Sequence, residues 1–239
     1  MVRADGLTVA RGRTVLLRDF SLEVGAGETM HVVGPNGCGK SSLLRVLAGV
    51  VEPRRGRVRR SAPCVYLPER LMLSDSLPAR RWLRVTRASS APLSEDLDRR
   101  CGALSKGQLQ RVALAGAFSE RRSGPHVFVL DEPWAGLDAA ARAGLGADIG
   151  ALAADGSTVL YTDHSGAATI APTRTLRLGD GGAALEAHPA GEPAPANDRS
   201  RVRIELSRDG ERISLTVDDA EFAARLAEGW EIERGEPLR

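Results

Sequence analysis

Short apolar runs recur along the first three quarters of the chain and alternate with longer segments of helical character. Phe20, Leu22 and Val24 alternate with polar residues, which predicts a half-buried strand. Three further runs have strand length, at residues 28–33, 127–132 and 157–164. Helices are predicted at residues 41–48, 107–118 and 139–154, the first of them ended by Gly49. Because strands alternate with helices, the pattern predicts an α/β fold with a mostly parallel sheet covered on both faces.

The last fifth of the chain has a different pattern. The Pro- and Ala-rich stretch at 189–200 predicts a linker between a large domain, 1–188, and a small C-terminal α/β domain, 201–239. Alternation at 202–206 and 213–217 around Asp209-Gly210 predicts a hairpin. A helix at 218–228, ended by Gly229, and a further strand complete the predicted ββα(β) appendage. These 39 residues are too few for a core of their own, so we expect them to pack on the large domain or on a second copy.

Composition narrows the class of protein. The hydrophobic content is 42%, the net charge is +2, and no apolar run approaches the ~20 residues that span a bilayer. The first residues lack the apolar stretch of a signal peptide, and the three cysteines show no metal-binding spacing, which favours the cytoplasm. Only two of the 33 basic residues are lysines, Lys40 and Lys106. Both lie in motifs with chemical meaning.

The first motif is GPNGCGKS, residues 34–41, which fits G-x-x-x-x-G-K-[ST] between a predicted strand and a predicted helix. Its glycines allow backbone N–H groups to surround a phosphate, and the helix start adds a partial positive charge. Lys40 can reach the terminal phosphates and Ser41 can ligate Mg²⁺. The alternative, an ordinary glycine-rich turn, does not explain the Lys-Ser pair at this place.

Two further strands end in polar residues. HVFVLDEP ends in Asp131, suited to a Mg²⁺ shell, and Glu132, suited to polarising a water molecule. YTDHSG places His164 after the next apolar strand, where it can donate to a γ-phosphate. Read alone, the carboxylates could be solvated strand ends and the histidine structural. The third motif, LSKGQLQR at 104–111, places Ser105 and Gly107 at a helix start, where Ser105 can cap the helix or donate to a phosphate.

Taken in order, GPNGCGKSSLLRVLAG, LSKGQLQRVALAGAF, VFVLDEPWAGLD and YTDHSG resemble the Walker A, signature, Walker B with D-loop, and switch-histidine motifs of the ATP-binding cassette (ABC) ATPases. The resemblance covers about residues 5–187 and implies an ABC cassette of the P-loop NTPase fold, with an N-terminal antiparallel β subdomain and a helical subdomain. It implies ATP and Mg²⁺ as cofactors, Glu132 and His164 as catalytic residues, and Ser41 and Asp131 as metal ligands. The implied ATP-binding residues are Gly34, Pro35, Asn36, Gly37, Cys38, Gly39, Lys40, Ser41 and Ser42.

Because cassettes of this family pair head to tail, the resemblance also implies a second cassette as partner. Ser105, Lys106, Gly107 and Gln108 would then face the ATP of that partner, and Asp138 of the D-loop would lie at the dimer interface. Lys106 stands where the family often has glycine, and we expect it to add a positive charge near the partner's triphosphate.

The sequence departs from the family at three places. Arg11 stands where an aromatic residue normally stacks on adenine, although a guanidinium can also lie over a purine. Glu69, in VYLPER, stands where the family has the glutamine that reaches Mg²⁺ and water. Only 63 residues separate Lys40 from Leu104, so the helical subdomain must be shortened, to segments such as LPARRWLRVTRA and SEDLDRRC.

The arginine-rich segment PRRGRVRR, residues 53–60, could contact nucleic acid or anionic lipid. Its Pro53 and Gly56 favour instead a solvated turn between strands, so no nucleic-acid partner is expected.

The resemblance implies the ATP-hydrolysing subunit of an ABC transporter, which separate transmembrane permease subunits would place at the cytoplasmic face of the membrane. LLRVLAGVVEPRRGRV resembles small exporter cassettes, including the haem-exporter type, which favours export over import. Two alternatives stay open: a soluble ABC-type ATPase, and a nucleotide-responsive interaction module with little turnover.

Overall fold

The structure is a computed structural model that describes residues 1–71, 73–85, 98–119, 124–164, 166–179, 182–187, 202–208, 211–217 and 231–237. The chain divides into two compact units, Met1–Ala194 and Pro195–Arg239, and the division falls within the predicted linker. Among the described residues, no helix has the length and apolar character needed to cross a bilayer.

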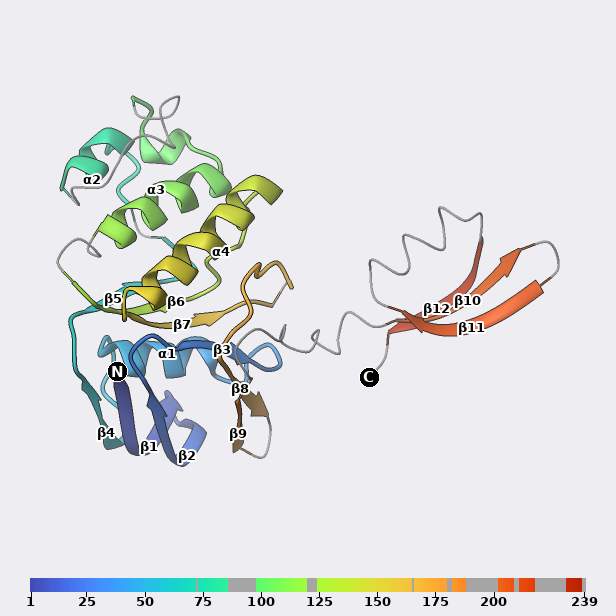
Figure 1. Cartoon of the computed structure of the whole chain (residues 1–239), viewed down its shortest axis with the longest axis horizontal. Coiled ribbons are helices and arrows are strands. Elements are labelled where there is room, and N and C mark those ends of the chain that lie inside the picture. Colours follow the sequence, from blue (N-terminus) through green and yellow to red (C-terminus); the bar gives the residue numbers. More distant parts are fainter. Residues whose placement is uncertain are drawn as a thin grey trace. The chain divides into compact units, whose positions relative to one another are not determined.

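A six-stranded sheet forms the centre of the larger unit (Figure 1). Its order is β5-β6-β7-β3-β8-β9, with parallel pairing throughout except for the antiparallel edge strand β9. The prediction of a mostly parallel sheet is therefore confirmed. The strands are β3 (Thr29–Val33), β5 (Cys64–Leu67), β6 (Val127–Leu130), β7 (Thr158–Thr162), β8 (Arg174–Gly179) and β9 (Gly182–Ala187).

Both faces of this sheet are covered, and neighbouring residues of its strands enter different cores. In β6, Val127 and Val129 pack with residues of helix α1 (Lys40–Ala48), whereas Phe128 and Leu130 pack with residues of helix α4 (Ala139–Ala154). Figure 1 shows α1 on one side of the sheet and α4 on the other. This two-sided burial explains why β6 and β7 are apolar without alternation.

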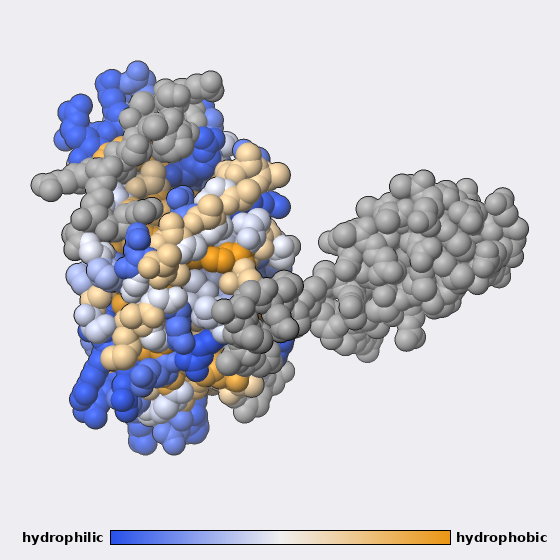
Figure 2. Space-filling view, viewed as in Figure 1, coloured by the Kyte–Doolittle hydropathy of each residue, from blue (hydrophilic) through white to orange (hydrophobic). Residues whose placement is uncertain are grey.

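A separate antiparallel sheet, of order β2-β1-β4, packs on the α1 side. It consists of β1 (Val2–Arg11), β2 (Thr14–Val24) and β4 (Arg55–Arg60). Figure 2 shows hydrophilic side chains gathered over this end of the unit. The antiparallel β subdomain that the resemblance implied is present.

The prediction of a turn at 53–60 is wrong for residues 55–60, because they form the strand β4. Val58 lies opposite Ala4 on the core side, while Arg57 lies opposite Asp5 and approaches its carboxylate at 3.7 Å. Gly56 adopts φ 83 where a Cβ would lie 2.5 Å from the Asp5 carbonyl oxygen. A single inward-facing valine among arginines gives too weak an alternation to reveal a strand.

A helical region lies between β5 and β6. It contains α2 (Ala79–Val85), a 3₁₀ turn (Cys101–Ala103) and α3 (Lys106–Phe118), with a small core of Ala79, Leu83 and Val112. Helix α2 confirms the helix predicted in LPARRWLRVTRA. The first half of SEDLDRRC, residues 94–97, lies outside the described residues. Asp98 to Arg100 form no helix, and Cys101 begins the 3₁₀ turn, so a helix is not found in the described half.

The smaller unit contains a three-stranded antiparallel sheet of order β11-β10-β12. Its strands are β10 (Val202–Arg208), β11 (Glu211–Val217) and β12 (Glu231–Pro237). The predicted pairing of 202–206 with 213–217 is confirmed, and β12 is the further strand. The Asp209-Gly210 turn, the helix at 218–228 and the linker at 189–200 lie outside the described residues.

Candidate nucleotide site

The glycine-rich loop joins β3 to α1 in a conformation that only glycines accommodate. Gly34 has φ 149, and a Cβ there would lie 2.4 Å from the Leu178 carbonyl oxygen and 2.9 Å from the Cys38 sulfur. Gly39 has φ 111 at the N-cap of α1, and no side chain caps this helix start. Because no acidic residue lies in the first turn of α1, its N–H groups and partial positive charge remain available to an anion.

Lys40 folds back over this loop. Its Nζ donates to the carbonyl oxygens of Gly34 at 2.8 Å and Pro35 at 3.2 Å. These contacts hold the ammonium group at the edge of the loop, where an incoming phosphate can replace one carbonyl as its partner.

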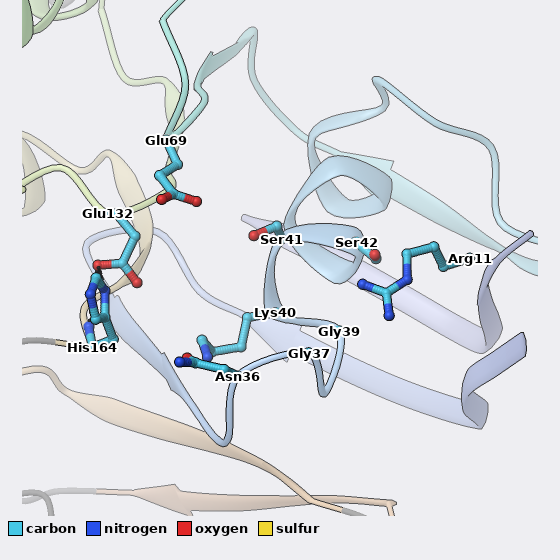
Figure 3. A pocket seen from close by; sticks show the side chains of 10 residues that line it. All are labelled: Arg11, Asn36, Gly37, Gly39, Lys40, Ser41, Ser42, Glu69, Glu132 and His164. Carbon is cyan, nitrogen blue, oxygen red and sulfur yellow. Dashed lines mark hydrogen bonds and ion pairs between the residues drawn. The ribbon is translucent and has the colours of Figure 1, made fainter.

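A pocket of about 310 Å³ opens in front of the loop, within the range of small-molecule sites. It brings together ten of the residues predicted for the site, which are Arg11, Asn36, Gly37, Gly39, Lys40, Ser41, Ser42, Glu69, Glu132 and His164 (Figure 3). Gly34, Pro35 and Cys38 belong to the same loop without lining the pocket. The Ser105–Gln108 segment and Asp138 do not line it.

The acidic pair follows β6 directly. Asp131 is buried, with 2% of its surface exposed, and is not one of the residues that line the pocket, whereas Glu132 is. The Glu132 Oε2 lies 2.6 Å from His164 Nδ1 and accepts the backbone N–H of His164 at 3.2 Å. Burial raises the pKa of the Glu132 carboxyl, and its contact with His164 acts in the opposite direction. A raised pKa suits a carboxylate that takes a proton from water.

One functional neighbour was missed by sequence reasoning. Thr162, at the end of β7, is fully buried and lies between the two acids. Its hydroxyl accepts the backbone N–H of Glu132 at 2.9 Å and donates to Asp131 Oδ1 at 2.9 Å. The available signal was a polar residue at the end of an apolar strand, two positions before His164.

The two residues that depart from the family both line the pocket. Figure 3 shows Glu69 reaching from the segment after β5 toward the space between Ser41 and Glu132. It shows Arg11, at the end of β1, on the side of the pocket next to Ser42. The pocket thus holds a guanidinium at one side and an additional carboxylate at the other.

The LSKGQ segment begins α3 and is stabilised within its own chain. Ser105 accepts the Gln108 backbone N–H at 3.2 Å, and Gln108 Oε1 accepts the Ser105 backbone N–H at 2.8 Å, which is a complete capping box. A Cβ on Gly107 would lie 2.2 Å from the Gly136 carbonyl oxygen, so this glycine permits the loop before α4 to approach. Lys106 is exposed. Asp138 caps α4 by accepting the Ala141 N–H at 2.8 Å.

The residues of the pocket fit a nucleoside triphosphate with Mg²⁺. Lys40 and the uncapped start of α1 supply positive charge for phosphates, Arg11 supplies a guanidinium that can lie over a purine, and Ser41 supplies a hydroxyl oxygen for the metal. Among the described residues, no three His, Cys, Asp or Glu side chains cluster closely enough to hold a metal alone. Mg²⁺ commonly takes one or two carboxylates together with substrate phosphates, which agrees with this arrangement.

A parallel sheet with a glycine-rich phosphate loop after β3, and an acidic pair after β6, two strands away in the sheet, defines a P-loop nucleoside triphosphatase. The sequence model described as ABC transporter matches residues 17–135. Two curated relatives, described below, are more than 30% identical to the chain over nine tenths of their own length. The chain therefore belongs to the ABC transporter family, among its ATP-binding proteins.

The relatives carry two kinds of name. The zinc import ATP-binding protein ZnuC of Alkalilimnicola ehrlichii is 41% identical over 58% of this chain and 58% of its own length. The cytochrome c biogenesis ATP-binding export protein CcmA is 34% identical in Sphingopyxis alaskensis, covering 69% of this chain and 90% of the relative. In Novosphingobium aromaticivorans it is 38% identical, covering 73% and 94%. The chain thus spans less than two thirds of the zinc import protein and nearly all of the export proteins.

Solved structures agree on the fold. The ATP-binding subunit of an ABC transporter superposes with a TM-score of 0.68 at 23% identity, covering 78% of this chain and 90% of that one. A metal-chelate type ABC transporter in an inward-facing conformation gives 0.65 at 18% identity, covering 93% and 98%.

Proposed function

We propose that this protein binds and hydrolyses ATP in order to power transport by separate transmembrane subunits. The observation that carries the proposal is the single pocket that joins the phosphate loop, with Lys40 and Ser41, to the Glu132–His164 pair. A site that only bound a nucleotide would not need a buried carboxylate held 2.6 Å from a histidine.

Each group has a distinct task in this mechanism. Lys40 and the start of α1 bind the β- and γ-phosphates. Ser41 and Asp131 are the residues that would hold Mg²⁺, and the ion would supply positive charge beside the phosphates. Glu132 orients the attacking water and takes its proton as the water oxygen bonds to the γ-phosphorus and the bond from that phosphorus to the bridging oxygen of ADP breaks. Because His164 Nδ1 faces Glu132, its Nε2 is the nitrogen that can donate to the γ-phosphate.

The proposed assembly is a head-to-tail pair of cassettes at the cytoplasmic face of the membrane. Ser105, Lys106, Gly107 and Gln108 of one copy close over the ATP of the other, and Asp138 lies at the interface. The start of α3 supports this role because it supplies a second helix N-terminus with a serine hydroxyl. The helical region between β5 and β6 is the proposed contact with the membrane subunits.

Export is the proposed direction. It is supported by the relatives named as export proteins, of which the chain covers 90% and 94%, against 58% for the zinc import protein. Import is the competing proposal, because one of the relatives is named as a zinc import protein. Reconstitution with its transmembrane subunits in vesicles, followed by measurement of the side of the membrane from which ATP removes the substrate, would decide between export and import.

Steady-state hydrolysis by wild type and Glu132→Gln tests the catalytic proposal. The amide keeps the shape of the carboxylate but cannot accept the proton, so we expect a fall of about 100-fold or more in kcat, with ATP binding retained. Because burial raises the pKa of Glu132, wild-type activity should begin to decline, as the pH falls, at a pH above the usual titration range of a glutamate. Equal background rates in both proteins would favour the nucleotide-responsive module instead.

A further inference from the structure

Thr162 connects the two acids of the site through one hydroxyl group. It lies at the end of β7, next to β6 in the sheet, with Tyr161 opposite Leu130. Its Oγ1 accepts the backbone N–H of Glu132 and donates to the carboxylate of Asp131, each at 2.9 Å. The hydroxyl has a single proton, so accepting from Glu132 and donating to Asp131 fixes its orientation.

The backbone of Glu132 needs this support. Its φ is 55, one of only two positive φ values at non-glycine positions among the described residues. A side chain in the left-handed region costs roughly 1–2 kcal/mol, so the conformation must be held by its surroundings. Glu132 is buried, and its N–H would be without a partner if the Thr162 oxygen were removed.

The side chain of Glu132 is held less firmly than its backbone. Its contacts are with His164, whose side chain is 54% exposed. Thr162 is 0% exposed and belongs to a strand paired along its length. The rigid anchor of the Glu132 backbone is therefore Thr162, and the position of the carboxylate depends on that anchor.

We propose that Thr162 is a positioning residue that sets the backbone of Glu132 and orients the Asp131 carboxylate toward the metal. The inference rests on the proposed function, in which Glu132 activates the water and Asp131 holds the metal. It predicts two separable effects when the hydroxyl is lost: slower hydrolysis through Glu132, and weaker dependence of nucleotide binding on Mg²⁺ through Asp131.

Thr162→Val removes the hydroxyl at nearly constant volume, Thr162→Ser keeps the hydroxyl, and Thr158→Val is the matched control. Thr158 lies at the other end of β7, is also fully buried, and donates to the Gly25 carbonyl oxygen at 2.8 Å, outside the pocket. The full chain of each variant is measured for kcat and KM, for the affinity of a fluorescent ATP analogue in Mg²⁺ and in EDTA, and for thermal unfolding.

For Thr162→Val we expect kcat to fall about 10- to 100-fold with KM changed by less than about threefold. The ratio of affinities in Mg²⁺ and in EDTA should shrink about tenfold. Thr162→Ser should restore both values to within about fivefold. Thr158→Val should also lower the unfolding temperature, because it loses a buried hydrogen bond, while leaving kcat and the ratio of affinities in Mg²⁺ and in EDTA (the metal ratio) at wild-type values. If Thr162→Val fails to fold, Thr162→Ala replaces it, since it differs from Thr162→Ser by one oxygen.

Wild-type kcat and an unchanged metal ratio in folded Thr162→Val would overturn the inference, as would equal losses in Thr158→Val. Failure of the proposed function has a different result, namely equal rates in wild type and Glu132→Gln. In that case the metal ratio alone decides: a smaller ratio in Thr162→Val supports the task assigned through Asp131, and an unchanged ratio overturns it.

Discussion

Helices α1 and α3 both begin at a glycine-containing motif, yet their first turns are satisfied in opposite ways. The start of α1 has Gly39 as N-cap and no side chain that accepts from its N–H groups. The start of α3 is closed by the Ser105–Gln108 capping box. The first is therefore prepared for a ligand in the free chain, whereas the second is stable without one.

The magnitudes suggest how α3 could still take part in ATP binding. An N-cap is worth about 1 kcal/mol, whereas a hydrogen bond to a charged group contributes about 1.5–3 kcal/mol. A phosphate of a partner's nucleotide can therefore displace or share the Ser105 hydroxyl with a net gain. The comparison suggests that binding to the α1 pocket comes first and that closure over α3 follows.

Removal of Lys40 should have the largest effect, because it acts on the helix start that is already prepared. Lys40→Ala should weaken ATP-analogue binding about 100-fold or more by loss of a charge-assisted contact, as measured by fluorescence titration. Lys40→Arg keeps the charge, but its planar fork does not fit the loop carbonyls that hold Nζ, so binding should still fall about tenfold. Unchanged affinity in Lys40→Ala would contradict the proposal that this loop binds the phosphates.

Substitutions of Ser105 separate the cap of α3 from contact with a partner's phosphate. Ser105→Ala should lower the free energy of unfolding by about 1 kcal/mol, since it breaks the capping box. Ser105→Asp should keep the stability, because aspartate is an equally good N-cap. Both variants should lose ATP-dependent dimerisation in a Glu132→Gln background, measured by light scattering.

The nucleotide affinity of the monomer is the control for Ser105, because this residue does not line the pocket. Normal dimerisation of Ser105→Asp would show that no phosphate approaches α3, since a carboxylate beside a triphosphate is repelled.

Elements with a regular pattern of apolar and polar residues could be predicted from the sequence. Features that depend on contacts between strands could not. Helix α1 ends at Gly49 as predicted, because Gly49 adopts φ 76 and donates its N–H to the Arg45 and Val46 carbonyls. The strand β4 was missed because only Val58 faces inward. The task of Thr162 was missed because its partners are 30 and 31 residues away in the chain.

The capping box of α3 shows the same limit. Ser105 was predicted as a cap from its position, but Gln108 was assigned to a partner's ATP by resemblance alone. In the free chain, Gln108 completes the cap. A motif indicates which residues matter, while geometry shows that one residue can serve two partners.

Substitution of Glu69 should have a smaller effect on ATP binding, and this effect concerns the pocket at the start of α1. Glu69 lines the pocket as an exposed carboxylate, so it opposes the positive charge of the α1 start. Glu69→Gln should therefore tighten ATP binding in EDTA about threefold to fivefold, as expected for one partly screened charge. Glu52→Gln, an exposed acid outside the pocket, is the control.

In Mg²⁺ the gain from Glu69→Gln should be smaller than in EDTA, because a carboxylate near the metal attracts it while repelling the phosphates. An equal gain under both conditions would show that Glu69 does not approach the metal.

Lys106 should have the smallest effect, because it is exposed and the capping box of α3 does not depend on its side chain. In the Glu132→Gln background, Lys106→Ala should weaken ATP-dependent dimerisation about threefold, the size expected for a screened charge facing a partner's triphosphate. Lys106→Arg should dimerise as the parent does, because it keeps the charge. The loss should also vanish at high salt, whereas the loss in Ser105→Asp should persist in part. Unchanged dimerisation of Lys106→Ala at low salt would make this lysine a solvated residue at the helix start, and Ser105 would then remain the contact to test on the α3 side.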